Sequence, residues 1–291
     1  MSVDHSGDEL LRDDPRRPTF IVIGAMKAGT TSLWHYLSEH PEVFMSTPKE
    51  PGYFNPHRRV SHGADWYLSL FDGAGEAVAR GEASTSYTKA PDVPDVPARM
   101  RAALPDVRLV YVVREPIARM RSMYRHQVDR GEETLPFAEA IQRRPEYVEW
   151  SRYGHQASRY LDHFDADRLL IVSSIDLRDR AQETMGTVFD FLEVQPMASE
   201  RFSVPHHAAE GKFAFSSRWE AVRRTARSAG VSERVPTRWK QRARAAVGRN
   251  LRSAELELPA DLERSLRRRL APDLEQLREL APADCSLWSD G

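Results

Sequence analysis

The feature that most constrains this chain is a short β-branched segment, Thr-Phe-Ile-Val-Ile at 19–23, that runs directly into Gly24-Ala-Met-Lys-Ala-Gly29-Thr-Thr-Ser. Runs of this kind are typical of buried parallel strands. Apolar residues then recur at helical spacing at Leu33, Trp34 and Leu37. A strand, a glycine-rich turn and a helix in this order open a nucleotide-binding α/β unit, so we expect an anion-binding turn near the start of the chain.

Strand and helix patterns alternate along the next two-thirds of the chain. We expect strands at 79–83, 107–113 and 168–173, and helices after Pro116, near 151–164 and near 179–192. This alternation predicts a P-loop-like, three-layer α/β/α fold with a central parallel sheet and additional C-terminal helices. Because the chain has 291 residues, we expect a flexible leader over 1–17 and a single domain over 18–291.

Composition excludes several classes of protein. A single cysteine, Cys285, rules out a disulfide scaffold. No apolar run is long enough to span a bilayer, and the acidic, polar start lacks a signal-peptide core. We therefore expect a cytoplasmic protein, and the bias toward arginine and alanine suits a bacterial one. Only five of the 42 basic residues are lysines, so a lysine within a motif stands out.

The net charge of −1 hides a basic segment. Between Arg218 and Arg252 eleven basic residues accompany two acidic ones, and the expected basic helical region is about 214–258. It forms either a solvated helical face or a patch that binds an anionic substrate, polymer or surface. In the second case the patch could contact a membrane surface. We do not expect nucleic-acid binding, because Trp219 and Trp239 are the only aromatic residues in the stretch that could stack on bases.

The glycine turn departs from that of nucleoside triphosphatases. Those enzymes need Lys and then Ser or Thr directly after the second glycine, and a carboxylate that holds magnesium. Here Thr30 and Thr31 follow Gly29, the lysine is Lys27 inside the turn, and the strand at 107–113 ends in Arg114. We therefore expect an anionic group to bind without a metal ion, which suits sulfuryl transfer from an adenylyl sulfate.

These residues carry a family resemblance. Phe20 to Leu33 closely resembles the 5′-phosphosulfate loop of sulfotransferases that use 3′-phosphoadenylyl sulfate, and Leu109 to Pro116 followed by Ser122 is similar to their 3′-phosphate segment. Four further stretches are similar to the heparan-sulfate branch: His40-Pro41, Lys49 to Phe54, His207 to Phe213, and Leu287-Trp288. The resemblance runs from about residue 19 to 288.

The resemblance implies a role for each motif residue. Lys27 would stabilise the leaving phosphate oxygen, Glu50 would act as base, and Lys49 would polarise the sulfate or keep Glu50 ionised. In the turn, Ala25, Met26, Ala28 and Gly29 offer N–H groups. The donor-binding residues implied are Gly24, Ala25, Met26, Lys27, Ala28, Gly29, Thr30, Thr31, Ser32, Arg114, Ser122, His207, Gly211 and Lys212.

Residues around these motifs receive simpler interpretations. His57 and His62 are reserve bases. The aromatic pairs Tyr53-Phe54 and Trp66-Tyr67 are expected in the core rather than in a pocket wall. The remaining arginines of the helix that carries Ser122, at 119, 121 and 125, are expected at the solvated surface.

The expected activity is in-line transfer of a sulfuryl group to a hydroxyl or amine, leaving adenosine 3′,5′-bisphosphate. The acceptor is a carbohydrate, a glycolipid or a glycosylated secondary metabolite. Two alternatives remain open on the sequence. A P-loop small-molecule kinase would need magnesium and ATP, and a non-catalytic nucleotide- or glycan-binding protein would bind without turnover.

Overall fold

The computed structural model describes residues 9–57, 63–203, 213–215, 248–250 and 256–288. Its strands form a parallel five-stranded sheet in the order β2-β3-β1-β4-β5 and an antiparallel pair, β6-β7. The strands are β1 Phe20–Gly24, β2 Val43–Met45, β3 Ala79–Ala83, β4 Arg108–Val113, β5 Leu169–Ser173, β6 Phe213–Phe215 and β7 Gly248–Asn250.

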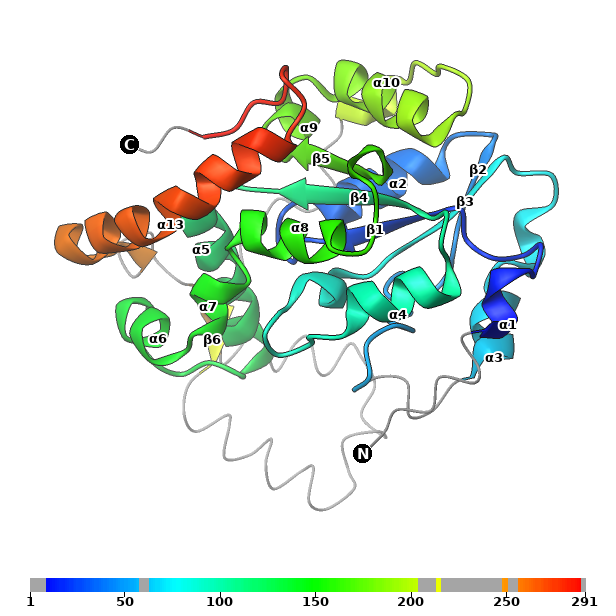
Figure 1. Cartoon of the computed structure of the whole chain (residues 1–291). Coiled ribbons are helices and arrows are strands. Elements are labelled where there is room, and N and C mark those ends of the chain that lie inside the picture. Colours follow the sequence, from blue (N-terminus) through cyan, green and yellow to red (C-terminus); the bar gives the residue numbers. More distant parts are fainter. Residues whose placement is uncertain (1–8, 58–62, 204–212, 216–247, 251–255, 289–291) are drawn as a thin grey trace.

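Helices cover both faces of this sheet, with α4, α8 and α13 in front of it and α2 behind it in the view of Figure 1. The α-helices are α1 Glu9–Arg12, α2 Thr30–Ser38, α3 Ala64–Ser69, α4 Val96–Ala103, α5 Pro116–Arg130, α6 Phe137–Arg143, α7 Glu146–Glu149, α8 Tyr153–Leu161, α9 Asp176–Asp179, α10 Ala181–Leu192 and α13 Ala260–Leu280. Short 3₁₀ turns are η2 Asp72–Ala74, η3 Thr85–Thr88, η4 Ala166–Arg168 and η5 Glu200–Ser203. The expected three-layer α/β/α arrangement with a parallel sheet is confirmed.

The central strands are apolar because both of their faces are covered. Every residue of β1, and of β4 after Arg108, is buried, which explains their continuous β-branched character. Strands β1 and β4 pair in register from Phe20 opposite Arg108, with a shift between Val22 and Gly24 at the carboxyl end. The turn after β1 therefore leaves the sheet beside the end of β4.

Two sequence expectations about the ends of the fold need correction. Residues 9–17 are not a loose leader: α1 lies against α3 and α4, and Leu11 is fully buried. The region 214–258 is not uniformly helical. Its described residues include β6 and β7, and β6 lies against α5. The residues between β6 and β7, for which a peripheral membrane contact was expected, lie outside the described residues.

A buried cluster of aromatic rings surrounds one carboxylate near the end of β3. Tyr53 stacks on Tyr67 at 4.5 Å between ring centroids, and Phe54 packs edge-on against Tyr87. These rings confirm the expected core role of the Tyr53-Phe54 pair. Glu82 of β3 lies fully buried among them, and burial raises the pKa of its carboxyl to about 7.

This buried carboxyl generates a prediction for stability. The folded chain holds the Glu82 proton to higher pH than the unfolded chain, whose carboxyl titrates near the ordinary value of 4.5. Between about pH 4.5 and 7 the unfolded state therefore binds fewer protons, so the free energy of unfolding falls as pH rises. We expect wild type to lose stability relative to Glu82→Gln across this window, measured by urea unfolding. Glu76→Gln, at an exposed site, is the control, and a relative gain of stability by wild type would contradict the assignment.

Candidate active site

A cavity of about 620 Å³ opens at the carboxyl edge of the parallel sheet. Ligands of open α/β sheets bind at this edge, where the loops after several strands meet. The lining residues come from the turn after β1, the loop after β2, the segment after β3, the end of β4, helix α5 and the end of α7. They are Met26, Lys27, Gly29, Thr30, Thr31, Ser32, Glu50, Thr85, Lys89, Arg114, Ser122, His126, Gln127, Arg130, Glu132 and Trp150.

The turn between β1 and α2 is anchored to the sheet by its own first residues. The Ala25 N–H donates to Val112 O at 2.7 Å, and the Ala28 N–H donates to Ala25 O at 3.1 Å. Both alanines are buried beneath the turn, so the expectation that their N–H groups face a ligand is wrong. Gly24 has no room for a side chain, because a Cβ there would lie 2.1 Å from Thr88 Oγ1.

The exposed side of the turn has the shape of an anion-binding nest. Lys27 and Gly29 adopt left-handed φ angles of 70° and 110°, on either side of Ala28. Alternation of right- and left-handed residues turns backbone N–H groups toward one concavity. Helix α2 begins directly afterwards at Thr30, so the partial positive charge of its N-terminus adds to the same place. This arrangement suits a phosphate or a sulfate.

Arg114 and Ser122 reach the cavity from neighbouring elements, as the strand-to-helix turn predicts. Arg114 follows the last residue of β4, and its Nη1 donates to Lys27 O at 3.3 Å. Burial lowers the pKa of its guanidinium, which is half-buried where it lines the cavity. The next residue, Glu115, caps α5 by accepting from the N–H groups of Ile117 and Ala118.

The carboxylate of Glu50 lies on the same cavity as Lys27. Thr85 Oγ1 is 3.2 Å from each of its two oxygens, and Lys49 Nζ lies 3.2 Å from Oε1. Lys49 Nζ is also 3.5 Å from Thr30 Oγ1, which ties Glu50 to the first residue of α2. Lys49 does not itself line the cavity. The arrangement places the Glu50 carboxylate near the first residue of α2, with the Lys49 ammonium paired to it.

The cavity is also lined by residues that the motifs did not indicate. Lys89 Nζ lies 4.2 Å from the centre of the Trp150 ring, and Trp150 Nε1 donates to Asp92 at 2.7 Å. His126 and Arg130 lie one and two turns after Ser122 on α5. Their spacing from Ser122 therefore predicts that they face the same side of the helix. Lys89 could also have been singled out from the sequence, because it is one of only five lysines in the chain.

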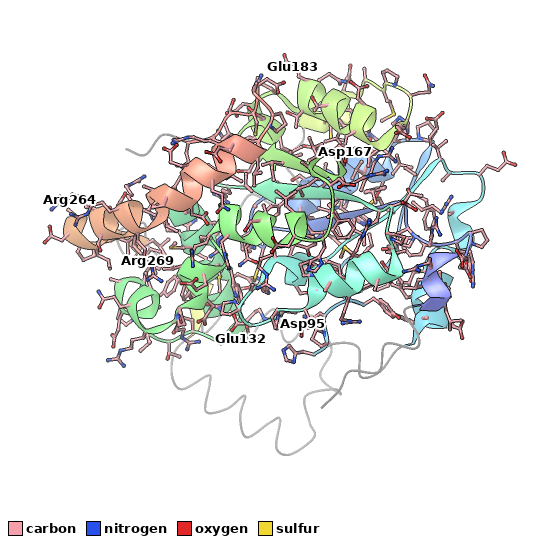
Figure 2. The ribbon with its side chains drawn as sticks, viewed as in Figure 1. Asp95, Glu132, Asp167, Glu183, Arg264 and Arg269 are labelled. Atoms are coloured by element: carbon pink, nitrogen blue, oxygen red, sulfur yellow. The ribbon has the colours of Figure 1, made fainter. Side chains whose placement is uncertain are left out.

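The other lining residues that the motifs did not indicate are Thr85, Gln127 and Glu132. Glu132 follows the end of α5 and is labelled in Figure 2. Arg264 and Arg269, also labelled there, lie on α13 and do not line the cavity. Arg269 instead pairs with Glu149 at 2.7 Å.

Other expected residues lie elsewhere. His207, Gly211 and Lys212 fall outside the described residues, as does His62. Arg119 is not solvated: it is fully buried, and donates to Ser151 Oγ at 2.7 Å and Tyr147 O at 2.6 Å. It is enclosed because α5 packs here against α7, which carries Tyr147, and against Ser151 just after it. Within the described ranges, no group of three or more His, Cys, Asp or Glu side chains could hold a metal ion.

Comparisons with known proteins agree with this site. Residues 17–210 match the family model described as "Sulfotransferase domain", which spans Lys27, Glu50, Arg114 and Ser122 but ends before Gly211. The chain therefore belongs to the sulfotransferase domain family. Because the chain belongs to this family, it is an enzyme of the sulfotransferase class. This excludes the two alternatives, a small-molecule kinase and a non-catalytic binding protein.

Two relatives illustrate the similarity. Over 207 residues the chain is 30% identical to "Bifunctional heparan sulfate N-deacetylase/N-sulfotransferase 2" of Homo sapiens, covering 62% of this chain and 22% of that protein. Over 114 residues it is 33% identical to "Membrane-associated sulfotransferase kil1" of Dictyostelium discoideum, covering 38% and 23%. The chain thus spans less than a quarter of the length of either relative.

A solved structure gives the same fold. A sulfotransferase from Alicyclobacillus acidocaldarius superposes with a TM-score of 0.68 at 24% identity, covering 93% of this chain and 97% of that one. No helix among the described residues is both long and apolar enough to cross a membrane.

The left-handed backbone of the turn predicts how a substitution of Gly29 changes stability. A Cβ at Gly29 has room, with Leu177 Cδ2 the nearest atom at 3.7 Å, but the φ of 110° disfavours any side chain. We expect Gly29→Ala to lower the free energy of unfolding by about 1–3 kcal/mol through backbone strain. Gly186→Ala is the control: this glycine lies within α10 with nothing near its Cβ position. The control should stabilise by about 0.5–1 kcal/mol. Equal effects of the two substitutions in chemical unfolding would contradict the strained turn.

Proposed function

We propose that the protein transfers the sulfuryl group of 3′-phosphoadenylyl sulfate to a hydroxyl or amine of a carbohydrate, glycolipid or glycosylated metabolite, without a metal ion. The observation that carries this proposal is that Lys27, Glu50, Arg114 and Ser122 line one cavity around an anion-binding turn. Family membership supports sulfuryl transfer, and the donor and the acceptor are inferred from the chemistry of these residues.

The donor would lie with its 5′-phosphosulfate in the nest and its 3′-phosphate between Arg114 and Ser122. N–H groups around Lys27 and Gly29, with the hydroxyls of Thr30 and Thr31, suit the first anion. A guanidinium and a hydroxyl suit the second, which distinguishes this donor from ATP. Met26 and Ser32 also line the cavity, whereas Gly24, Ala25 and Ala28 would act by shaping the turn. His207, Gly211 and Lys212 remain proposed ligands of the 3′-phosphate.

The transfer step needs one base and one cation. The acceptor oxygen or nitrogen forms a bond to sulfur while the bond from sulfur to the 5′-phosphate oxygen breaks, and the acceptor proton passes to Glu50. Negative charge grows on the leaving phosphate oxygen, where the Lys27 ammonium stabilises it more in the transition state than in the ground state. Lys49, 3.2 Å from Glu50, forms an ion pair with the proposed base. Adenosine 3′,5′-bisphosphate is released.

The acceptor would enter the half of the cavity formed by Lys89, His126, Arg130 and Trp150. An indole ring beside cationic groups suits a sugar ring that carries acidic substituents. The similarity to a heparan sulfate N-sulfotransferase supports a carbohydrate acceptor. Because that relative is matched over 22% of its length, its own substrate is not transferred to this chain.

Loss of either donor-binding cation should abolish activity. We expect Lys27→Ala to lower kcat by at least about 100-fold, the effect of removing one transition-state charge partner. Arg114→Ala should weaken adenosine 3′,5′-bisphosphate binding, measured by calorimetry. Arg143→Ala, an exposed arginine paired with Glu139 on α6, is the control and should behave as wild type. Full transfer of labelled sulfate by both variants would overturn the proposal, as would a requirement for magnesium and ATP.

The base generates a separate prediction. Glu50→Gln keeps the size of the side chain but cannot take a proton at neutral pH. We expect kcat to fall by about 100- to 10,000-fold, the usual contribution of a general base, with donor affinity unchanged. The conservative control is Thr85→Ser, which retains the hydroxyl that contacts Glu50. Turnover of Glu50→Gln equal to wild type would assign the base to another group.

A further inference from the structure

The fully buried carboxylate of Glu82 has three hydroxyl partners and does not line the cavity. Ser84 Oγ donates to Oε2 at 2.6 Å, and the hydroxyls of Tyr87 and Tyr67 donate to Oε1 at 2.7 and 3.1 Å. A buried carboxylate is costly unless hydrogen bonds compensate for the lost water. Because burying the Glu82 carboxylate costs free energy, we asked which neighbouring residues its hydrogen bonds hold in place.

Two of these hydroxyls also hold the segment that carries Glu50, residues 50–54, which we call the base loop. The Gly52 N–H donates to Ser84 Oγ at 2.9 Å, and the Phe54 N–H donates to Tyr87 Oη at 3.3 Å. The Glu50 N–H donates to Ala83 O at 3.0 Å. Every second N–H of the base loop is therefore bonded to the chain segment that directly follows Glu82.

The direction of these bonds depends on the carboxylate. Above its pKa of about 7 Glu82 is ionised and only accepts, so Ser84 and Tyr87 each give it their single hydroxyl proton. Their oxygen lone pairs are then turned to accept the N–H groups of the base loop. Hydrogen bonds in such chains polarise and strengthen one another in a water-free interior. Glu82 thus acts on the base loop through two hydroxyl relays, without touching it.

The base loop needs this support because its backbone is strained. Glu50 has a φ of 64° and Gly52 a φ of 67°, both left-handed. A non-glycine residue in this region costs of order 1 kcal/mol and persists where the surroundings fix it. Without the bonds at residues 52 and 54, Glu50 is free to relax to an ordinary φ, which turns its carboxylate away from Thr85 and the nest.

We propose that Glu82 is a positioning residue for the base, fixing the Glu50 carboxylate in the cavity through Ser84 and Tyr87. The inference rests on the proposed function, because it takes Glu50 as the group that accepts the proton.

A double-mutant cycle on the full chain tests this inference. We expect Ser84→Ala to lower kcat about 10-fold with the donor KM unchanged, because small displacements of a reacting group cost up to about 100-fold. In the Glu50→Gln background the same substitution should cost nothing further, since its effect passes through Glu50. Equal losses in both backgrounds would overturn the inference and indicate a general structural defect.

Tyr67→Phe is the matched control. It removes one hydrogen bond from Glu82, as Ser84→Ala does, but in the described part of the chain the Tyr67 hydroxyl bonds to Glu82 and not to the base loop. We expect its kcat within about twofold of wild type, whereas Tyr87→Phe, which also removes the bond to the Phe54 N–H, should resemble Ser84→Ala. Should Ser84→Ala fail to fold, Tyr87→Phe replaces it in the cycle. A loss in Tyr67→Phe as large as in Tyr87→Phe would contradict the relay.

Hydrogen exchange separates this inference from the proposed function. In Ser84→Ala the Gly52 amide should exchange at least about 10-fold faster than in wild type, while Ala25, bonded to β4, keeps its rate. This readout does not depend on turnover. Absence of sulfuryl transfer by wild type would overturn the proposed function alone. An unchanged Gly52 exchange rate would overturn the positioning role alone.

Discussion

The site depends on how the turn after β1 is held against the end of β4. The Ala25 N–H bonds to Val112 O of β4, and Arg114, directly after the last residue of β4, donates to Lys27 O in the turn. These two bonds fix the nest and the guanidinium relative to one another before any ligand binds. A preorganised set of positive groups stabilises developing charge without rearrangement during the reaction, which is the main physical requirement for this chemistry.

The proposed base, Glu50, is held from the other side of β1 by different means. Strand β3 ends beside β1, and the segment after it holds Glu50 through backbone and hydroxyl contacts. The charged groups are therefore held at the ends of two strands on opposite sides of β1: Arg114 follows β4, and Glu50 is bonded to Ala83 at the end of β3. Strands β3 and β4 flank β1 on opposite sides, so the segments that carry Thr85 and Arg114 approach the turn after β1 from opposite sides.

The sequence was informative where a function is encoded by contiguous residues. The turn at 24–31, Arg114 after its strand and Ser122 on the following helix could be predicted because short-range geometry alone fixes them. Lys89 and Trp150 were missed because only tertiary packing joins their segments. Burial was the least accessible property: local spacing did not reveal that Arg119 is enclosed, nor that Ala25 and Ala28 use their N–H groups internally. The role of Glu82 likewise depends on partners distant in sequence.

The most direct test of the account is a crystal structure with adenosine 3′,5′-bisphosphate, grown with a chelator present. The account expects the 5′-phosphate in the nest against Lys27 and the 3′-phosphate between Arg114 and Ser122, with Glu50 facing the position that the sulfuryl group would occupy. A nucleotide bound elsewhere, with the turn empty and Arg114 directed away from it, would contradict the central claim.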